Sequence, residues 1–286
     1  MSSTIRTPIQ RRFFHTLRPL QHENPLGLPR SGSIPRMQRG LPERRNIKDV
    51  AKVIAVSSAK GGVGKSTVAA NLALSFARLG HRSGILDTDI FGPSIPTLFN
   101  LNEEPRLSQN NQLLPLSNYG VKTMSMGYLV GEEAPVVWRG MMVMKALQQL
   151  LHEVDWGGLD VLVLDLPPGT GDTQLSITQQ IVLDDAVKGI NMFKKVKVPI
   201  LGLVNNMSLF TCPKCGGQHH IFGTSDGVQK VCSDHEIAFL GDIPLHQNIG
   251  SHAQEGKPTV VAEPESERAE AFMGIARDVA SQIGLV

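Results

Sequence analysis

The sequence has few cysteines, few aromatic residues and no long apolar run, and each shortage excludes a class of protein. Three cysteines among 286 residues cannot build the paired disulfide framework of a small secreted protein, which favours a reducing compartment. No apolar run approaches the roughly 20 residues that a membrane-spanning helix needs. Hydrophobic residues still make up 41% of the chain, which is enough for a large core, and the low aromatic content of 5% with 28 glycines is typical of α/β proteins.

Acidic residues are almost absent from residues 1–40. This segment has seven arginines and one acid, Glu23, so it contributes +6 to the net charge of +2 and the remaining chain carries −4. Arginines that alternate with Ser, Thr, Leu and Phe, without a continuous apolar core, predict a mitochondrial (matrix) transit peptide and a disordered linker over residues 1–40. A basic tail with another role and a chloroplast address are the alternatives. The acidic remainder, residues 41–286, is predicted to be one domain that does not bind nucleic acid.

A glycine-rich segment at residues 57–67 reads Ser-Ser-Ala-Lys-Gly-Gly-Val-Gly-Lys-Ser-Thr. It follows an apolar, β-branched run at 53–56 and precedes a helical pattern at 65–79, which is the context that a phosphate-binding loop requires. Glycines allow successive backbone N–H groups to surround a phosphate at the positive end of the helix. We expect Lys65 to contact the β- and γ-phosphates and Ser66 to bind Mg²⁺. The expected nucleotide-binding residues of the loop are Ala59, Lys60, Gly61, Gly62, Val63, Gly64, Lys65, Ser66 and Thr67.

Two acids follow predicted parallel strands. Asp89 comes just after a short strand at 83–86, and Asp165 ends a buried-strand run at 159–165. Since ligands of such folds bind at the carboxyl ends of the strands, both carboxylates are expected beside the phosphate loop. Asp89 is predicted to hold Mg²⁺ through water or to orient the attacking water, and Asp165 to approach Mg²⁺ through its water shell. For Asp89 the alternative is that it caps the next turn.

The two cysteines Cys212 and Cys215 are separated by Pro-Lys and followed by two glycines. This spacing presents both sulfurs to one metal and suits zinc and iron–sulfur clusters equally. Two thiolates supply half of the usual four ligands. The missing ligands would come from a second copy of the chain or, for zinc, from among four candidates in this chain: His219, His220, Cys232 or His235. A redox dithiol is a third interpretation.

The remaining pattern contains one irregularity. Helices are predicted at 141–154 and 265–283, and strands at 199–204 and 238–244. Between them, helical patterns at 172–180 and 183–193 follow one another without a strand-sized segment, although a doubly wound sheet returns to a strand after each helix. A strand is therefore predicted to be missing after Gln180.

Six motifs in order resemble the Mrp/ApbC P-loop ATPases of the deviant-Walker branch, which includes MinD, ParA and the nitrogenase iron protein. The resemblance is greatest to the mitochondrial iron–sulfur members associated with respiratory complex I, and it extends from about Gly40 to the C-terminus. The motifs are Ala-Lys-Gly-Gly-Val-Gly-Lys-Ser-Thr (59–67), Asp-Thr-Asp-Ile-Phe-Gly-Pro-Ser-Ile-Pro (87–96), Val-Val-Trp-Arg-Gly (136–140), Asp-Leu-Pro-Pro-Gly-Thr-Gly-Asp (165–172), Asn-Met-Ser (206–208) and Cys-Pro-Lys-Cys-Gly (212–216).

The resemblance implies an α/β fold with a doubly wound, mostly parallel sheet flanked by helices, of the SIMIBI or MinD-like P-loop type. It implies a homodimer that uses ATP and Mg²⁺ and carries a [4Fe–4S] cluster to recipient apoproteins such as complex I subunits, with slow ATP hydrolysis as a switch. Lys60 would reach the partner's nucleotide, and Asn206 would contact the base. Cys212 and Cys215 of each subunit would hold the cluster, and Lys60, Lys65 and Asp89 would serve hydrolysis.

The chain departs from the family after Gln180, where relatives carry an apolar strand and a Thr-Pro turn. The omission amounts to roughly a dozen residues or more, because it includes both the turn and the strand, and a typical strand has about five residues. A gene-model or splicing error, or a folding-impaired isoform, is our hypothesis for it. A MinD- or ParA-like positioning ATPase and a zinc-stabilised nucleotide-binding regulator are the alternative functions.

Overall fold

The structure is a computed structural model, and it describes residues 45–58, 60–129, 140–169, 185–187, 190–195, 198–212, 214–222 and 225–285. The predicted transit peptide and linker therefore lie outside the described residues, as does the predicted gap after Gln180. Within the described ranges, no helix is both long enough and apolar enough to cross a membrane.

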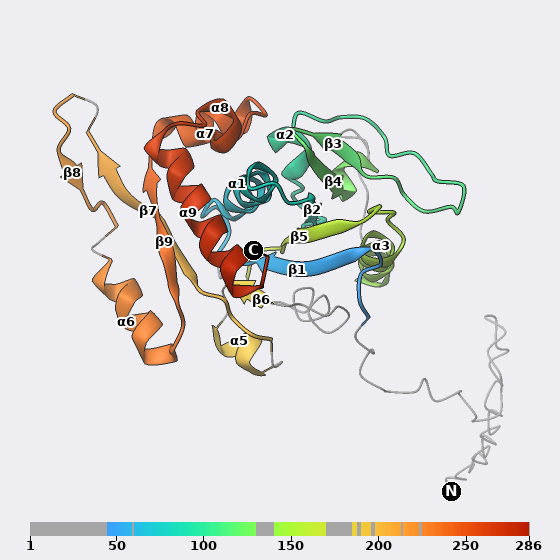
Figure 1. Cartoon of the computed structure of the whole chain (residues 1–286), viewed down its shortest axis with the longest axis horizontal. Coiled ribbons are helices and arrows are strands. Elements are labelled where there is room, and N and C mark those ends of the chain that lie inside the picture. The colour runs from blue at the N-terminus through green and yellow to red at the C-terminus, as the bar shows by residue number, and fades with distance from the viewer. Residues whose placement is uncertain are drawn as a thin grey trace, which may run out of the picture. The chain divides into compact units, whose positions relative to one another are not determined.

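Helices and strands alternate along the chain, as the sequence pattern predicts (Figure 1). The strands are β1 (Val50–Val56), β2 (Ser83–Asp87), β3 (Leu116–Asn118), β4 (Val121–Ser125), β5 (Leu159–Asp165), β6 (Asp185–Val187), β7 (Leu203–Thr211), β8 (Gln218–His219) and β9 (Phe239–Leu245). The helices are α1 (Lys65–Arg78), α2 (Ile95–Leu98), η1 (Met126–Tyr128), α3 (Gly140–His152), α5 (Ile190–Lys195), α6 (Asp226–His235), α7 (Gln247–Gln254), α8 (Thr259–Ala262) and α9 (Glu267–Gln282).

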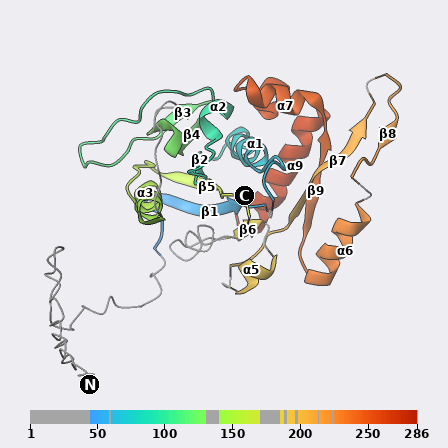
Figure 2. The ribbon, with the colours of Figure 1, turned by 180° about the vertical axis from the view of Figure 1, so that it is seen from behind.

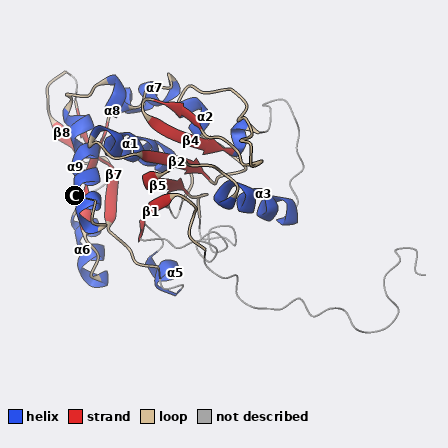
Figure 3. Cartoon of the chain, turned by 45° about the vertical axis from the view of Figure 1, so that its right-hand side comes forward, coloured by secondary structure: helices blue, strands red, loops and turns tan. Residues whose placement is uncertain are grey.

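The larger sheet has the strand order β3-β4-β2-β5-β1-β6 and is parallel except for the hairpin of β3 and β4. The buried stretches of β1 (53–56) and β5 (161–164) are apolar throughout, because both faces of the sheet are covered there. Ile54 and Val56 pack with α1 and α9 on one face, while Val53 and Ala55 pack with α3 on the other. Figure 3 shows α3 on the opposite side of the strands from α1 and α9. This two-sided packing confirms the doubly wound α/β fold.

The smaller sheet has the order β8-β7-β9. β7 pairs in parallel with β9 and in antiparallel with β8, and the β7–β8 hairpin projects beyond the helices (Figures 1 and 2). Helix α9 covers β9 and packs against α1, so that the two helices join the sheets. The apolar face predicted for the last helix is buried, with Phe272, Ile275, Val279 and Ile283 at most 5% exposed.

Two predicted elements were wrong in type or length. The helix predicted over 183–193 is broken, because residues 185–187 pair in parallel with the last three residues of β1 and only α5 is helical. The open edge of β1 outweighs the weak local preference of a three-residue segment. The strand predicted over 199–204 starts at Leu203 and continues to Thr211. A register shift after Asn206, with Met207 at a φ of 61°, lets β7 continue past the expected end.

The described strands therefore form two sheets, and no described pair joins β1 or β6 to β7 or β9. The sequence predicted a mostly parallel sheet that lacks one strand after Gln180. In Figure 3, β7 stands apart from the stack of β1, β5 and β2. The division falls between β6, the last strand of the larger sheet, and the smaller sheet that contains β7.

Candidate functional site

The phosphate loop leads from the end of β1 into α1 as predicted. Gly62 and Gly64 have φ angles of 74° and 79°, in the left-handed region that L side chains rarely adopt. Gly64 is also the residue before the first turn of α1, and a Cβ there would lie 2.7 Å from the side-chain nitrogen of Asn206. Only glycine fits this position. The loop thus has the backbone form of an anion cradle at a helix N-terminus.

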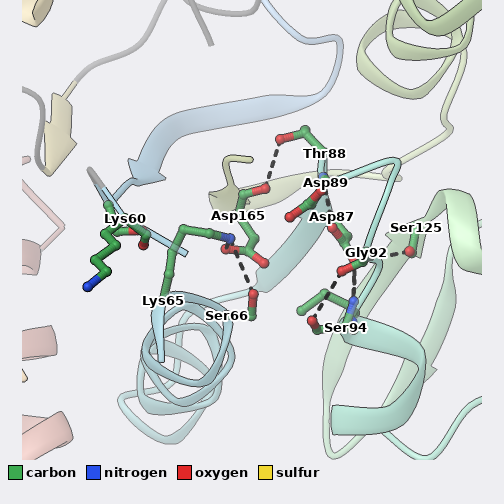
Figure 4. A network of polar contacts seen from close by, with 12 residues as sticks. Lys60, Lys65, Ser66, Asp87, Thr88, Asp89, Gly92, Ser94, Ser125 and Asp165 are labelled. Carbon is green, nitrogen blue, oxygen red and sulfur yellow. Dashed lines mark hydrogen bonds and ion pairs between the residues drawn. The ribbon is translucent and has the colours of Figure 1, made fainter. Parts of the chain in front are cut away.

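Lys65 and Asp165 form an ion pair below this loop (Figure 4). Their side chains are 7% and 0% exposed, and Lys65 Nζ also lies 3.2 Å from Ser66 Oγ. Burial raises the pKa of Asp165, and the charge of Lys65 acts in the opposite direction. The second carboxylate oxygen of Asp165, Oδ2, is buried without a hydrogen-bond partner among the described residues. An unpaired buried oxygen beside a lysine and a serine hydroxyl suits a hydrated cation.

Asp87 is a buried acid of the site that the sequence analysis did not assign. Its carboxylate accepts hydrogen bonds from the backbone N–H of Asp89 at 3.0 Å, of Ser94 at 3.0 Å and of Ile95 at 3.2 Å, and from Ser125 Oγ at 3.2 Å. Asp87 thereby fixes the loop between β2 and α2. The signal was present in the sequence, because the strand-end triplet Asp-Thr-Asp contains two acids.

Burial, and next the nearby charge of Asp165, raise the pKa of Asp87 to about 7. The middle residue of the triplet, Thr88, donates both its backbone N–H and its hydroxyl to the carbonyl oxygen of Asp165. These contacts tie the ends of β2 and β5 together. The acids that follow both strands therefore lie at one edge of the sheet, as expected.

A cavity of about 510 Å³ opens above the loop. It is lined by glycines of the loop, by Lys65, Ser66 and Thr67, and by Asp89, whose pKa is raised by burial. The last turn of α7 closes it with Ala253 and Gln254. The structure therefore brings Lys65, Ser66 and Asp89 into one cavity.

Lys60 stands apart from this group. Its side chain is exposed and points away from Lys65 and Asp165 (Figure 4). The backbone carbonyl of Lys60 accepts a hydrogen bond from Ser58 Oγ at 2.9 Å, which fixes the loop beneath it. Ala59, the neighbouring predicted residue, lies outside the described residues.

Asn206 connects β7 of the smaller sheet to the phosphate loop. Its side-chain nitrogen donates to the carbonyl oxygen of Val63 at 2.8 Å. The neighbouring Asn205 points elsewhere and donates to Asp242 at 2.7 Å. One residue of β7 thus touches the loop while the next one does not.

The cysteine pair lies on the turn between β7 and β8, and Cys212 is six residues beyond Asn206. The turn is closed by two backbone hydrogen bonds of 2.9 Å, from Cys212 N–H to the Gly217 carbonyl and from Gly216 N–H to the Cys212 carbonyl. Backbone N–H groups of Lys214 and Cys215 that point at the Cys212 sulfur lower the pKa of its thiol. Cys215 is exposed, and neither cysteine is in a disulfide. Two accessible thiols, one biased towards thiolate, suit a soft metal ligand pair.

The described residues do not complete a metal site around this pair. Among the described residues, no group of three or more His, Cys, Asp or Glu side chains is placed to hold a metal ion. Cys232 is buried in α6, where burial raises the pKa of its thiol, and His220 contacts the carbonyl oxygen of Ser208. His219 lies on β8, near the turn. The zinc site within one chain, left open by the spacing, has no structural support in this part of the chain.

The geometry of a phosphate loop with a separate cysteine hairpin agrees with the comparison to protein families. A family described as "NUBPL iron-transfer P-loop NTPase", of the ParA type, matches residues 49–280. The chain belongs to this family. Members of the NUBPL family are P-loop NTPases of iron–sulfur transfer, as the resemblance of the six motifs implied.

Several named proteins align with most of the chain. The mouse iron–sulfur cluster transfer protein NUBPL is 50% identical over 263 positions, covering 86% of this chain and 82% of the mouse protein. An Arabidopsis thaliana relative named "Iron-sulfur protein required for NADH dehydrogenase, mitochondrial" is 46% identical, with 84% and 81% covered. The iron–sulfur cluster carrier protein of Escherichia coli K12 is 46% identical, and the alignment covers 83% of this chain and 68% of the bacterial protein.

Solved structures show the same fold. A nucleotide-binding protein of Archaeoglobus fulgidus, in complex with ADP, superimposes with a TM-score of 0.67 at 34% identity and covers 78% of this chain and 93% of its own. MinD of Pyrococcus horikoshii with Mg-ADP has a TM-score of 0.57 at 20% identity, with 82% and 98% covered, which shows the MinD-like fold alone.

This member of the NUBPL family is shorter than its relatives within the aligned region. The mouse alignment runs over 263 positions, while 86% of 286 residues is about 246, so about 17 positions have no counterpart in this chain. The Escherichia coli alignment runs over 252 positions, while 83% of the chain is about 237 residues, a difference of about 15. Two independent relatives thus exceed the chain by a similar length, enough for one strand and a turn.

Proposed function

We propose that the chain is an ATP-dependent scaffold or carrier for [4Fe–4S] clusters that delivers them to mitochondrial apoproteins such as complex I subunits. It acts in the mitochondrial matrix as a homodimer. The cluster is its cargo, held by Cys212 and Cys215 of each subunit. The name of the plant relative refers to NADH dehydrogenase and to mitochondria, which supports this destination.

The observation that carries the proposal is the course of β7. The strand touches the phosphate loop through the hydrogen bond from Asn206 to Val63 and then leads directly to the cysteine turn. A change in the loop on nucleotide binding is thereby passed along five residues of continuous strand to the cargo ligands. This arrangement supports a nucleotide-controlled carrier better than it supports an ATPase with an unrelated metal site.

Nucleotide binding is assigned to the residues of the cavity. Mg²⁺, when bound with ATP, neutralises phosphate charge and orients the phosphates. Ser66 would be its hydroxyl ligand, and Asp165, with its unpaired oxygen, would hold its water shell. Lys65 exchanges its contact with Asp165 for the phosphates. Asp89 orients the water that attacks, and Asn206 contacts the base from the side of β7.

Dimerisation is assigned to the exposed side of the loop. Lys60 projects away from its own site, as a residue must if it is to reach the nucleotide of a second subunit. The cysteine pair supplies two of the four thiolates that a [4Fe–4S] cluster needs, so a two-fold axis beside the turn completes the set. Slow hydrolysis then switches the dimer between holding and releasing its cargo.

Anaerobic reconstitution with iron and sulfide tests the cargo. Wild-type protein should turn brown, with sulfur-to-iron charge-transfer absorbance and about four iron atoms per dimer, whereas Cys212→Ala and Cys215→Ala should stay colourless. Cys232→Ala is the matched control and should bind iron normally. A colourless wild type that holds zinc tightly contradicts the proposal.

A second measurement tests the dimer. Lys60→Ala should lose the dimerisation that depends on ATP and, with it, the cluster retention that depends on ATP, because each nucleotide loses the lysine of the partner subunit. Sedimentation with ATP and Mg²⁺ should show wild-type dimers and Lys60→Ala monomers. Equal dimerisation and equal hydrolysis by both proteins would remove the role assigned to Lys60.

A further inference from the structure

A second and larger cavity, of about 750 Å³, lies between the two sheets. Its floor is formed by Val68 and Leu72 of α1 and by Ile275 and Val279 of α9. These side chains belong to the main hydrophobic core, and each is at most 8% exposed. Helices that cover a sheet direct such residues onto a strand. Here they face a space between strands.

One wall of this cavity is a strand edge. There β7 pairs with β9 over Leu203–Asn206, but its opposite edge meets β8 only at Phe210 and Thr211. The facing wall contains the end of β1 and the first residues of the phosphate loop, at 56–58. From Leu203 to Met207 the described residues provide no strand partner on the side away from β9. Open edges of this kind are templates for strand addition.

The remaining wall comes from α6. Val228 and Val231 of this helix line the cavity, as does Phe222, which is 72% exposed. Apolar side chains that line an unfilled space lack the dispersion contacts that packed neighbours would supply. The cavity is therefore lined by apolar side chains of three helices and bordered on one side by the unpaired edge of β7.

We propose that this cavity, the inter-sheet groove, binds an extended apolar segment of another polypeptide that pairs with β7 as an added parallel strand. The relatives supply the length argument, because they exceed the chain by about 17 and about 15 aligned positions, one strand with its turn. The inference does not depend on the proposed cluster chemistry. It follows from the divided sheet, the cavity and the shorter aligned length.

The charge at one end of the groove sets the direction of the segment. Lys60 and Lys65 line the end beside the phosphate loop, where Asn206 also lies. Since β7 runs towards this end, a parallel segment has its carboxyl-terminal side there. The groove thus fits about five apolar residues, β-branched ones above all, followed by hydroxyl or acidic residues.

The probe is a synthetic peptide, the longest stretch of the mouse relative that has no counterpart in this chain. Added to the full chain, the labelled peptide should bind saturably at one per chain and raise the unfolding midpoint as its concentration rises. Amide hydrogen exchange should slow at residues 203–207. Protection elsewhere, or no saturation at millimolar peptide, overturns the proposal.

Matched variants locate the site. Val231→Glu places a charge in the groove at a side chain that is 38% exposed, so the fold is kept, and it should weaken peptide binding at least about tenfold because the charge must be desolvated. Gln229→Glu, on the exposed part of the same helix, should leave binding unchanged. Equal affinities of the two variants contradict the inference.

Modified peptides and sedimentation exclude the other occupants. N-methylation of alternate backbone nitrogens keeps the side chains but blocks strand pairing, so it should abolish binding, whereas retained binding refutes strand addition. If a second copy fills the groove instead, the chain alone sediments as a dimer that Val231→Glu dissociates, and the peptide does not bind. That result would replace the proposed partner.

Discussion

The side-chain nitrogen of Asn206 lies 2.8 Å from the carbonyl oxygen of Val63, so β7 of the smaller sheet holds the phosphate loop by one hydrogen bond. A Cβ atom on Gly64 would lie only 2.7 Å from the same side-chain nitrogen of Asn206. Loop and strand are thus fitted to each other at a single point. Cys212 follows directly after the last residue of this strand. Under the proposed function, this contact would couple nucleotide occupancy to the cysteine turn.

Asn206→Ala should weaken nucleotide binding by about 1 kcal/mol, about fivefold, because the Val63 carbonyl loses its partner and the loop is less ordered. Asn205→Ala removes an equal amide from the adjacent position, which contacts Asp242 instead, and should bind nucleotide normally. Titration calorimetry with ADP and Mg²⁺ measures both. Similar losses in the two variants would mean that the strand, and not this contact, matters.

Lys65→Ala should abolish nucleotide binding and also destabilise the fold. It leaves Asp165 buried without its counter-ion, and removing one partner of a buried pair costs about 3–5 kcal/mol. Adding Asp165→Asn to Lys65→Ala should restore part of the stability but none of the binding. Urea unfolding and nucleotide titration separate the two effects. If Lys65→Ala alone is as stable as wild type, the ion pair between Lys65 and Asp165 has no structural role.

The stability of the protein should fall as the pH rises from about 4 to about 7. The pKa of Asp87 is raised to about 7 from its ordinary 3.8, chiefly by burial, so folding favours the protonated carboxyl. Its contribution is fully present below the unfolded pKa and is lost as the pH rises through the folded one, a change of a few kcal/mol at most. Urea midpoints of Asp87→Asn should lack this decline.

Asp160→Asn is the control of opposite sign. Hydrogen bonds from Arg82 lower the pKa of Asp160, so its contribution is present above the unfolded pKa and is lost as the pH falls through the folded one. The difference between this variant and wild type should be constant from pH 5 to 8 and shrink only below about 4. If both variants differ from wild type with the same pH profile, a general charge effect explains the data.

Cys212 should react with iodoacetamide faster than the other two cysteines near neutral pH. Backbone N–H groups lower the pKa of its thiol, whereas burial raises that of Cys232. Cys212→Ser should remove the fast phase of alkylation, and Cys232→Ser should leave it intact. Peptide mapping after short labelling times identifies the modified residue. Uniform labelling of the exposed cysteines would contradict a special environment at Cys212.

Local patterns predicted most of the fold. The β-branched runs at 53–56 and 159–165, and the apolar face of the last helix, are determined by side-chain periodicity, which requires no knowledge of distant contacts. The same reasoning failed at residues 183–193, where pairing of residues 185–187 with β1 outweighed a weak helical preference. It also ended β7 too early, because a bulge that continues a strand leaves no local signature.

The sequence by itself determined the chemistry, because Lys65, Ser66, Asp165 and the cysteine pair are recognisable from residue type and spacing along the chain. Tertiary structure alone decided which of these groups meet. Lys65 pairs with Asp165 across 100 positions, Asp87 joins the site through contacts that its own strand does not reveal, and Asn206 holds the loop from another sheet. Such contacts depend on how strands are ordered side by side, and the same ordering leaves the groove beside β7.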